Sequence, residues 1–189
     1  MSRDLQSTEL SPDSAFVAGA IIGVLMLIMG GVAALTHLPW VFPSLGATIF
    51  ILIGVPSAPP ASTKNTVCSH LIGIASGAFA LLICGLMSTP PNLLDVPPAR
   101  VAAITIACTF TAFLMLRLGV PHPPAMATTL IVSLGLIRAP QYLAVMALAV
   151  VLLVILARIA NYLRGYRLPM WAASSAAIDP AEMVSSESH

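Results

Sequence analysis

Long apolar runs alternate along the chain with short polar gaps that are rich in proline. A helix of about 20 residues spans the roughly 30 Å of hydrocarbon in a bilayer. Four runs approach or reach that length, at residues 16–35, 67–87, 101–116 and 142–163. Two others, residues 43–55 and 124–137, begin at a proline and are too short to cross comfortably. We therefore predict an all-α integral membrane fold with four full transmembrane helices and two short proline-led half-helices.

Composition agrees with this class. The chain is 58% hydrophobic and 8% charged, with a mean hydropathy of +0.98, whereas an average soluble domain is roughly 45–50% apolar. Its main partner is therefore expected to be the lipid bilayer. The net charge of +1 comes without any basic block, so nucleic acid is excluded as a partner.

The polar residues divide the chain into three parts. Residues 1–15 form a polar N-terminal tail, residues 16–163 a single transmembrane domain, and residues 164–189 a serine- and alanine-rich C-terminal tail. We predict the last part to be disordered.

The transmembrane domain contains a weak internal repeat. A shift of 80 residues places Pro43 on Pro123, Ala47 on Ala127, Thr48 on Thr128 and Ile51 on Ile131. Each half, about 16–88 and 98–163, follows the order long run, short run, long run, which allows an inverted repeat. Short or interrupted segments at matching places in two halves indicate a transporter binding site.

Basic residues give two alternatives for the short segments. If both short segments are re-entrant, five basic residues lie on one side of the membrane and three on the other. If both segments cross, six lie on one side and two, Arg100 and Arg138, on the other. The positive-inside rule mildly favours six crossings, with both termini in the cytoplasm in either case.

Two pairs of glycines stand four residues apart, Gly19 with Gly23 and Gly73 with Gly77. Small residues at this spacing let helix backbones approach closely in lipid. We expect both pairs to pack within one chain, with a dimer face as the alternative. A bundle of this size leaves little room for a closed pathway, which makes a homo-oligomer plausible.

Other chemistry is sparse. Cys68, Cys84 and Cys108 all fall in apolar runs and are expected to be packing residues, without a disulfide. The four histidines have no ligand spacing, so no metal and no cofactor is predicted. Asp95 is the one acidic residue between the tails, so we expect no enzyme.

Several motifs resemble one family. P-H-P-P-A at 121–125, S-L-G-A-T at 44–48, G-V-P-S-A-P at 54–59 and K-N-T-V-C-S-H at 64–70 resemble the HPP family of integral membrane proteins. That family is described as four-span, and its plastid and cyanobacterial members are nitrite transporters. The resemblance implies functional positions at His122, Pro123, Pro124, Ser44, Gly46, Ala47, Thr48, Lys64, Asn65 and His70. Met126 and Ser69 replace the glycines that are usual in the family.

The expected function is transport of a small inorganic anion, most simply nitrite, across a bacterial inner membrane. Free amides and positive dipole ends at the first turns of the two short helices would attract the anion. Gly46 and Ala47 would allow backbone approach, and Thr48, Thr128 and Thr129, beside Ala125, would donate hydroxyls. His122, with His70, is a candidate proton carrier or else a structural cap. A membrane assembly protein without transport remains the alternative.

Overall fold

The computed structural model describes residues 12–171. Within that range the chain is all-helical and has no strand. Its elements are α1 (Pro12–Thr36), α2 (Pro43–Gly54), η1 (Pro59–Ala61), α3 (Thr63–Ile83), α4 (Pro98–Arg117), α5 (Pro124–Ser133) and α6 (Pro140–Leu163). Four helices are long and apolar enough to cross a membrane, and α2 and α5 are shorter. The predicted fold class is confirmed.

Helix starts follow from proline and serine. The helices α2, α4, α5 and α6 each begin at a proline, whose fixed φ and missing N–H suit the first helical position. The start of α3 is different, because the Ser62 hydroxyl accepts a hydrogen bond from the Asn65 N–H at 3.2 Å. That bond satisfies one of the free amides of the first turn.

Helix ends follow from glycine. A glycine with positive φ follows α3, α4, α5 and α6, at Gly85, Gly119, Gly135 and Gly165. After α4, for example, the Val120 N–H bonds back to the Met115 carbonyl at 3.0 Å. This is the Schellman arrangement, which satisfies carbonyls that the ending helix leaves free.

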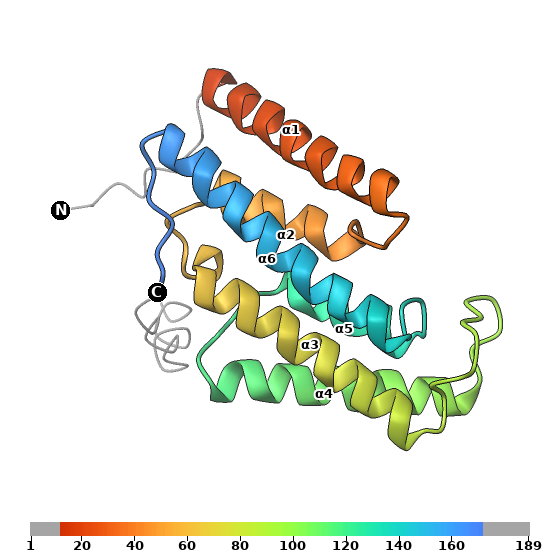
Figure 1. Ribbon diagram of the computed structural model, residues 1–189. Helices are drawn as coiled ribbons and strands as arrows, with labels where there is room; N and C mark the ends of the chain where they lie inside the picture. The colour runs from red at the N-terminus through yellow and green to blue at the C-terminus, as the bar shows by residue number, and fades with distance from the viewer. Residues whose placement is uncertain (1–11, 172–189) are drawn as a thin grey trace, which may run out of the picture.

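The helices form one bundle in which α3 is central (Figure 1). It packs against α4, α5 and α6, while α2 packs against α5 and α6. At one edge α1 rests on α2 and α6, and α4 forms the opposite edge (Figure 1). Only 17% of the most apolar window of α1 is buried, against 50% for α3. Most of α1 is therefore free to face lipid.

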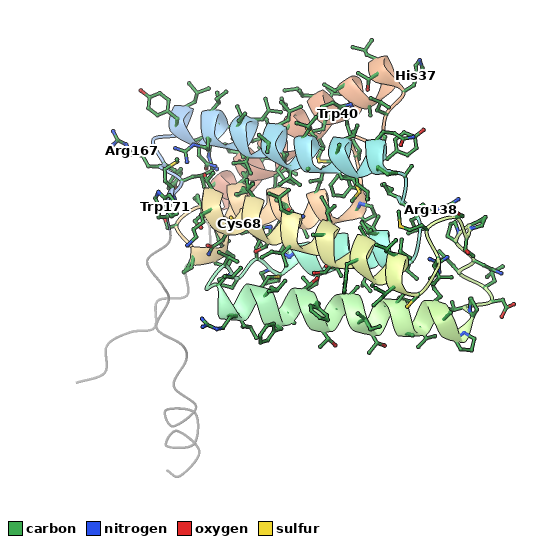
Figure 2. All side chains as sticks on the ribbon, turned by 60° about the horizontal axis from the view of Figure 1, so that its bottom comes forward. His37, Trp40, Cys68, Arg138, Arg167 and Trp171 are labelled. Carbon is green, nitrogen blue, oxygen red and sulfur yellow. The ribbon has the colours of Figure 1, made fainter. Side chains whose placement is uncertain are left out.

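Consecutive helices run in opposite directions, with their connections alternating between the two ends of the bundle (Figure 1). His37, Trp40 and Arg138 lie at one end, and Arg167 and Trp171 at the other (Figure 2). This is the connectivity of the six-crossing alternative, because a re-entrant α2 would enter and leave at the same end.

The two glycine pairs have different surroundings. A Cβ added at Gly73 would lie 2.8 Å from the Ala125 carbonyl oxygen, and one at Gly77 would lie 2.7 Å from Val132 Cβ. This pair therefore lets α3 approach α5 closely, as predicted. Gly19 and Gly23 have nothing within 4 Å of an added Cβ, so the prediction that they pack inside the chain is wrong.

The ends of the transmembrane domain differ slightly from the prediction. The helix α1 begins at Pro12 rather than at residue 16. Residues 164–171, expected to be disordered, pack on the start of α3: the Thr63 N–H donates to the Pro169 carbonyl at 3.0 Å, and Leu168 is buried. The remaining predicted tails, residues 1–11 and 172–189, lie outside the described residues.

Candidate functional site

The two short helices lie antiparallel, with their first turns side by side. Ser44 at the start of α2 contacts Thr128 on α5, with 2.7 Å between the hydroxyl oxygens. One turn further along α2, Thr48 lies 3.2 Å from Nε2 of His122, which precedes α5. The helix starts therefore overlap side by side rather than pointing at each other end to end.

His70 on α3 joins the two short helices. Its Nε2 lies 2.9 Å from the Thr48 hydroxyl and its Nδ1 lies 2.7 Å from the Thr128 hydroxyl. The His70 and His122 rings are 5.1 Å apart between centroids. We call Ser44, Thr48, His70, His122 and Thr128 the histidine–hydroxyl cluster. The sequence prediction that Thr48 and Thr128 meet at one polar site agrees with this geometry.

The cluster is closed off from the surroundings. Thr48, His70, His122 and Thr128 have an exposed fraction of 0%, and Ser44 of 1%. Buried polar groups are costly unless they are hydrogen-bonded, and every side chain of the cluster has a partner. The cluster thus fills the place where α2, α3 and the start of α5 meet.

Proton positions follow from the Pro60 carbonyl. His122 Nδ1 lies 2.8 Å from that oxygen, which can only accept, so Nδ1 carries the proton. Nε2 of a neutral His122 must then accept, and the hydroxyl facing it is that of Thr48. Thr48 has one proton, which it donates to the Ser44 carbonyl at 2.9 Å, so its 3.2 Å approach to His122 is the weaker contact. Nε2 of His70 must then donate to the Thr48 oxygen.

The remaining bonds then have one direction. With its proton on Nε2, His70 accepts at Nδ1 from the Thr128 hydroxyl, and Thr128 accepts from the Ser44 hydroxyl. The opposite tautomer of His70 would place an unprotonated Nε2 against the Thr48 oxygen, whose proton already bonds to the Ser44 carbonyl. Hydrogen bonds of one direction therefore run from the Ser44 hydroxyl through Thr128 and His70 to Thr48 and back to the Ser44 carbonyl. The His122 ring is held separately by the Pro60 carbonyl.

The electrostatics of the cluster favour neutral rings. His122 lies in the connection between α4 and α5, outside the four long helices. Burial lowers the pKa of His122 to about 4, while its hydrogen bond to the Pro60 carbonyl acts in the opposite direction. The hydrogen-bonding partners of both rings are hydroxyls and a carbonyl. A positive charge here would therefore lack a negative neighbour among these partners.

Other predicted residues of the short helices lie around the cluster or away from it. Pro124 and Ala125 are buried next to it, whereas Gly46, Ala47 and Pro123 are exposed. Nothing lies within 4 Å of an added Cβ at Gly46. The structure therefore places Gly46 and Ala47 on the outer side of α2, away from the histidine–hydroxyl cluster.

The amides at the start of α5 are also engaged. The Ala125 N–H donates to the His122 carbonyl and the Met126 N–H to the Pro123 carbonyl, both at 3.0 Å. These two amides are not free for an anion, contrary to the sequence-based expectation. Side chains, rather than backbone amides of this turn, supply the polar groups of the cluster.

Three predicted residues lie outside the cluster. Thr129 bonds to Thr111 on α4 at 2.9 Å and to the Ala125 carbonyl at 3.1 Å. Asn65 donates to the Pro59 carbonyl at 3.0 Å and so holds the η1 turn. The Lys64 amino group lies 5.3 Å from the centre of the Trp171 ring, at the end of the bundle that Trp171 marks in Figure 2.

Polar contacts that sequence reasoning missed hold this arrangement in place. The Ser69 hydroxyl donates to the Val120 carbonyl and ties α3 to the turn before His122. The Pro60 carbonyl fixes the His122 ring. A serine next to His70 was a visible signal, but a backbone carbonyl gives no sequence signal at all.

The carbonyl ends of both short helices are capped by longer helices. Asn161 of α6 and Arg164, just after α6, donate to the carbonyls of Leu52 and Ile53, at 2.9 and 3.1 Å. Arg100 of α4, with 2% of its surface exposed, donates to the Ser133 carbonyl at 3.4 Å. A helix that ends inside a bundle leaves free carbonyls that need donors, and positive charge suits that end of the dipole.

Comparison with known proteins identifies the family. The family model described as HPP, transmembrane region, matches residues 7–169. The chain belongs to the HPP family. No curated protein and no solved structure matches it. The family match and the four long apolar helices make this HPP protein an integral, multi-pass membrane protein.

The HPP motif now has a structural place. The first proline, Pro121, is partly buried, His122 is inside the cluster, Pro123 is exposed and Pro124 starts α5. Because proline cannot continue a helix from α4, the turn can enter the bundle and deliver the imidazole. Among the described residues no group of three His, Cys, Asp or Glu side chains could hold a metal ion.

Proposed function

We propose that this HPP protein transports a small inorganic anion across the membrane, with nitrite as the leading candidate, and that a proton accompanies it on the His70–His122 pair. The observation that carries the proposal is that Nε2 of both rings faces the same Thr48 hydroxyl, at 2.9 and 3.2 Å. A proton added to either ring is then shared through one hydroxyl between three packed elements.

Charge balance supports the coupling. The cluster by itself is neutral, so an anion entering it would raise the proton affinity of the imidazoles, and a bound proton would raise the affinity for the anion by the same factor. One proton per monovalent anion also cancels the charge moved against the membrane potential, which otherwise costs about 2.3 kcal/mol per 100 mV.

The pair is suited to one proton rather than two. Two unit charges at the observed 5.1 Å between ring centroids would repel by about 3 kcal/mol at an effective dielectric constant of 20. The second proton is therefore disfavoured, which gives a stoichiometry of one proton per anion. The Ser44, Thr48 and Thr128 hydroxyls would bind the anion beside the charged ring.

The proposed location is a bacterial inner membrane with both termini in the cytoplasm. The end of the bundle formed by the start of α3 and the ends of α4 and α6 carries most of the described basic residues. They are Lys64, Arg117, Arg158, Arg164 and Arg167, against Arg100 and Arg138 at the other end. The positive-inside rule assigns the richer end to the cytoplasm.

Uptake into proteoliposomes tests the proposal. Nitrite flux would be measured well above the pKa of nitrous acid, with and without an acidic exterior. Thr48→Val removes the shared hydroxyl at nearly constant volume, and Thr111→Val, a buried threonine outside the cluster, is the matched control. We expect an inward proton gradient to increase the nitrite flux of the unmodified protein. Thr48→Val should lower that flux about tenfold or more, which corresponds to the loss of one buried hydrogen bond to a charged group. Thr111→Val should have near-normal flux.

Two results would contradict parts of the proposal. Flux equal to that of empty vesicles would remove nitrite as substrate. Flux that is insensitive to the proton gradient and to Thr48→Val would remove the role of the histidine pair.

The second candidate is a membrane assembly protein without transport. It is favoured by the outward-facing Gly19 and Gly23 of α1, which have open space around them, because small residues at this spacing promote helix association in lipid. A stable complex in detergent that Gly23→Leu dissociates, combined with no anion flux for nitrite, nitrate or chloride, would favour this function.

A further inference from the structure

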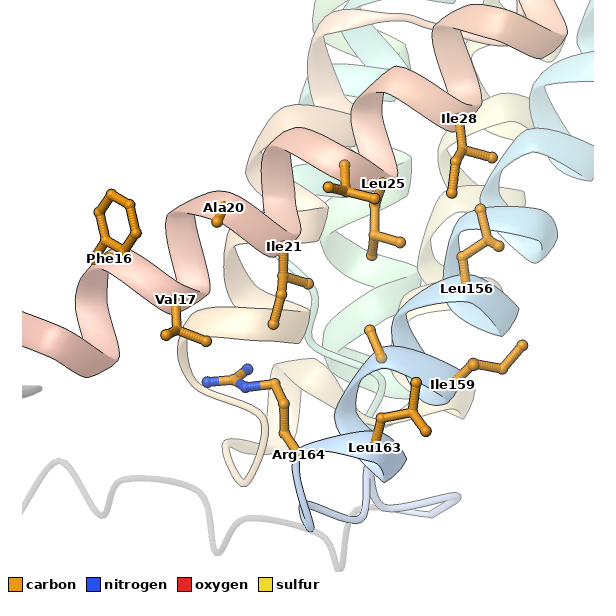
Figure 3. Close-up of a pocket in the computed structure, with 12 residues that line it drawn as sticks. Phe16, Val17, Ala20, Ile21, Leu25, Ile28, Leu156, Ile159, Leu163 and Arg164 are labelled. Carbon is orange, nitrogen blue, oxygen red and sulfur yellow. The ribbon is translucent and has the colours of Figure 1, made fainter.

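An apolar groove runs between α1 and α6 on the surface of the bundle (Figure 3). Its volume is about 490 Å³. The walls are aliphatic, with Val17, Ile21 and Leu25 from α1 and Leu156 and Leu163 from α6. Both helices are long enough and apolar enough to cross a membrane, so the groove opens toward hydrocarbon rather than water.

One charged side chain closes the groove at its end. The guanidinium of Arg164, just after α6, reaches toward Val17 and Ile21 of α1 (Figure 3). One of its terminal nitrogens donates to the Ile53 carbonyl at 3.1 Å. The central carbon of the guanidinium lies 5.0 Å from the centre of the Tyr166 ring. These partners are uncharged, so the guanidinium keeps donors and a full positive charge for a ligand.

That end of the groove has the features of a membrane interface. Arg158 and Arg167 lie close by, lining a separate hollow together with Tyr162 and Tyr166. Basic and tyrosine side chains gather where hydrocarbon meets headgroups. A guanidinium at that depth binds phosphate oxygens in a paired, planar geometry.

The dimensions of the groove suit a hydrocarbon chain. Residues 16–28 of α1 cover roughly 18 Å along the helix axis, and the groove between the helices has a volume of about 490 Å³. Carbon chains pack about 4 Å apart, so one extended chain fits along this length.

We propose that this groove is a phospholipid site, in which one acyl chain lies between α1 and α6 and the phosphate binds Arg164. The site is separate from the histidine–hydroxyl cluster and does not depend on the transported substrate. It would fasten the peripheral helix α1 to the bundle, since α1 buries little of its own surface.

Native mass spectrometry of the full chain from detergent tests the site. The probes are phosphatidylglycerol, a diacylglycerol with the same chains but no phosphate, and glycerol 3-phosphate. Ala20→Trp fills the groove, and Arg164→Gln removes the charge but keeps a donor for Ile53. The matched controls are Ala34→Trp, on an exposed part of α1 away from the groove, and Arg167→Gln.

We expect one retained phosphatidylglycerol per chain, about tenfold weaker retention of the diacylglycerol, and no retention of glycerol 3-phosphate. Ala20→Trp should abolish retention, and Arg164→Gln should reduce phosphatidylglycerol to the level of the diacylglycerol. Both controls should bind like the wild type. If Ala20→Trp does not fold, Ala160→Phe narrows the same groove from α6.

Three results would overturn the proposal. Unchanged binding in the groove-filling variant would show that the lipid binds elsewhere. Equal binding of both lipids, unaffected by Arg164→Gln, would remove the phosphate contact. A dimer that Ala20→Trp dissociates would make a second copy of the chain the occupant.

Discussion

His70 and His122 point the same ring nitrogen, Nε2, at a single hydroxyl, that of Thr48, from α3 and from the turn before α5. Their other nitrogens differ, because Nδ1 of His122 faces the Pro60 carbonyl and Nδ1 of His70 faces the Thr128 hydroxyl. Two equivalent side chains are thereby given unequal roles, one fixed by a carbonyl and the other by hydroxyls.

The two imidazoles should therefore be opposite tautomers at neutral pH. We expect ¹⁵N NMR of histidine-labelled protein to show a protonated Nδ1 in His122 and a protonated Nε2 in His70. Replacing Thr48 by Val should shift the resonances of both rings, since each loses its shared partner. Finding the same tautomer in both rings would contradict the hydrogen-bond directions at Thr48 and at the Pro60 carbonyl.

Acid should destabilise the fold through His122. Its pKa is lowered from 6.5 to about 4 in the folded chain, so between those values the unfolded chain binds more protons. The stabilisation from the neutral ring is fully present above about pH 6.5 and is lost as the pH falls toward 4, with a slope of up to about 1.4 kcal/mol per pH unit. Unfolding in detergent across this range should show a shallower slope in His122→Asn, and an unchanged slope would contradict the assignment.

Adding one methyl group at two glycines should have opposite effects. Gly77→Ala places a Cβ 2.7 Å from Val132 Cβ, so we expect a loss of about 1–3 kcal/mol from overpacking, partly recovered in the double variant with Val132→Ala. Gly23→Ala meets nothing within 4 Å and should be neutral or slightly stabilising, because alanine is the better helix former. Thermal unfolding in detergent compares the stability of the two variants. Equal losses of stability would mean that the close α3–α5 packing does not cause the effect of Gly77→Ala.

Arg100 should matter for stability more than other basic residues. It donates to the carbonyls of Ser133, Thr89 and Pro90 at 3.4, 3.0 and 3.3 Å. Arg100→Ala leaves these acceptors without their donor, for an expected cost on the order of 2–3 kcal/mol. Arg117→Ala, at an exposed position, is the control and should change the unfolding free energy by less than about 0.5 kcal/mol. A similar, small effect of both substitutions would exclude the proposed capping of α5.

Much of the local structure was readable from residue types. Apolar length and the prolines at residues 43 and 124 placed the helices within about four residues of where they are, although the starts of α4 and α6 at Pro98 and Pro140 were not predicted. The meeting of Thr48 with Thr128 was expected from the repeat, although the repeat itself did not indicate that His70 would join them. The capping contacts of Asn161 and Arg164 were missed, because they connect residues more than 100 positions apart.

The sequence by itself determined the membrane class, the family and the order of long and short helices, because these depend on composition, motifs and local backbone chemistry. Only the tertiary structure decided which side of each helix faces inward. It put Ser44 and Thr48 inside and Gly46 and Ala47 outside, and it buried Gly73 and Gly77 while leaving Gly19 and Gly23 exposed. The physical reason is that lipid is as apolar as the bundle interior. Hydrophobicity therefore does not select a face, and close packing with hydrogen bonds between distant residues does.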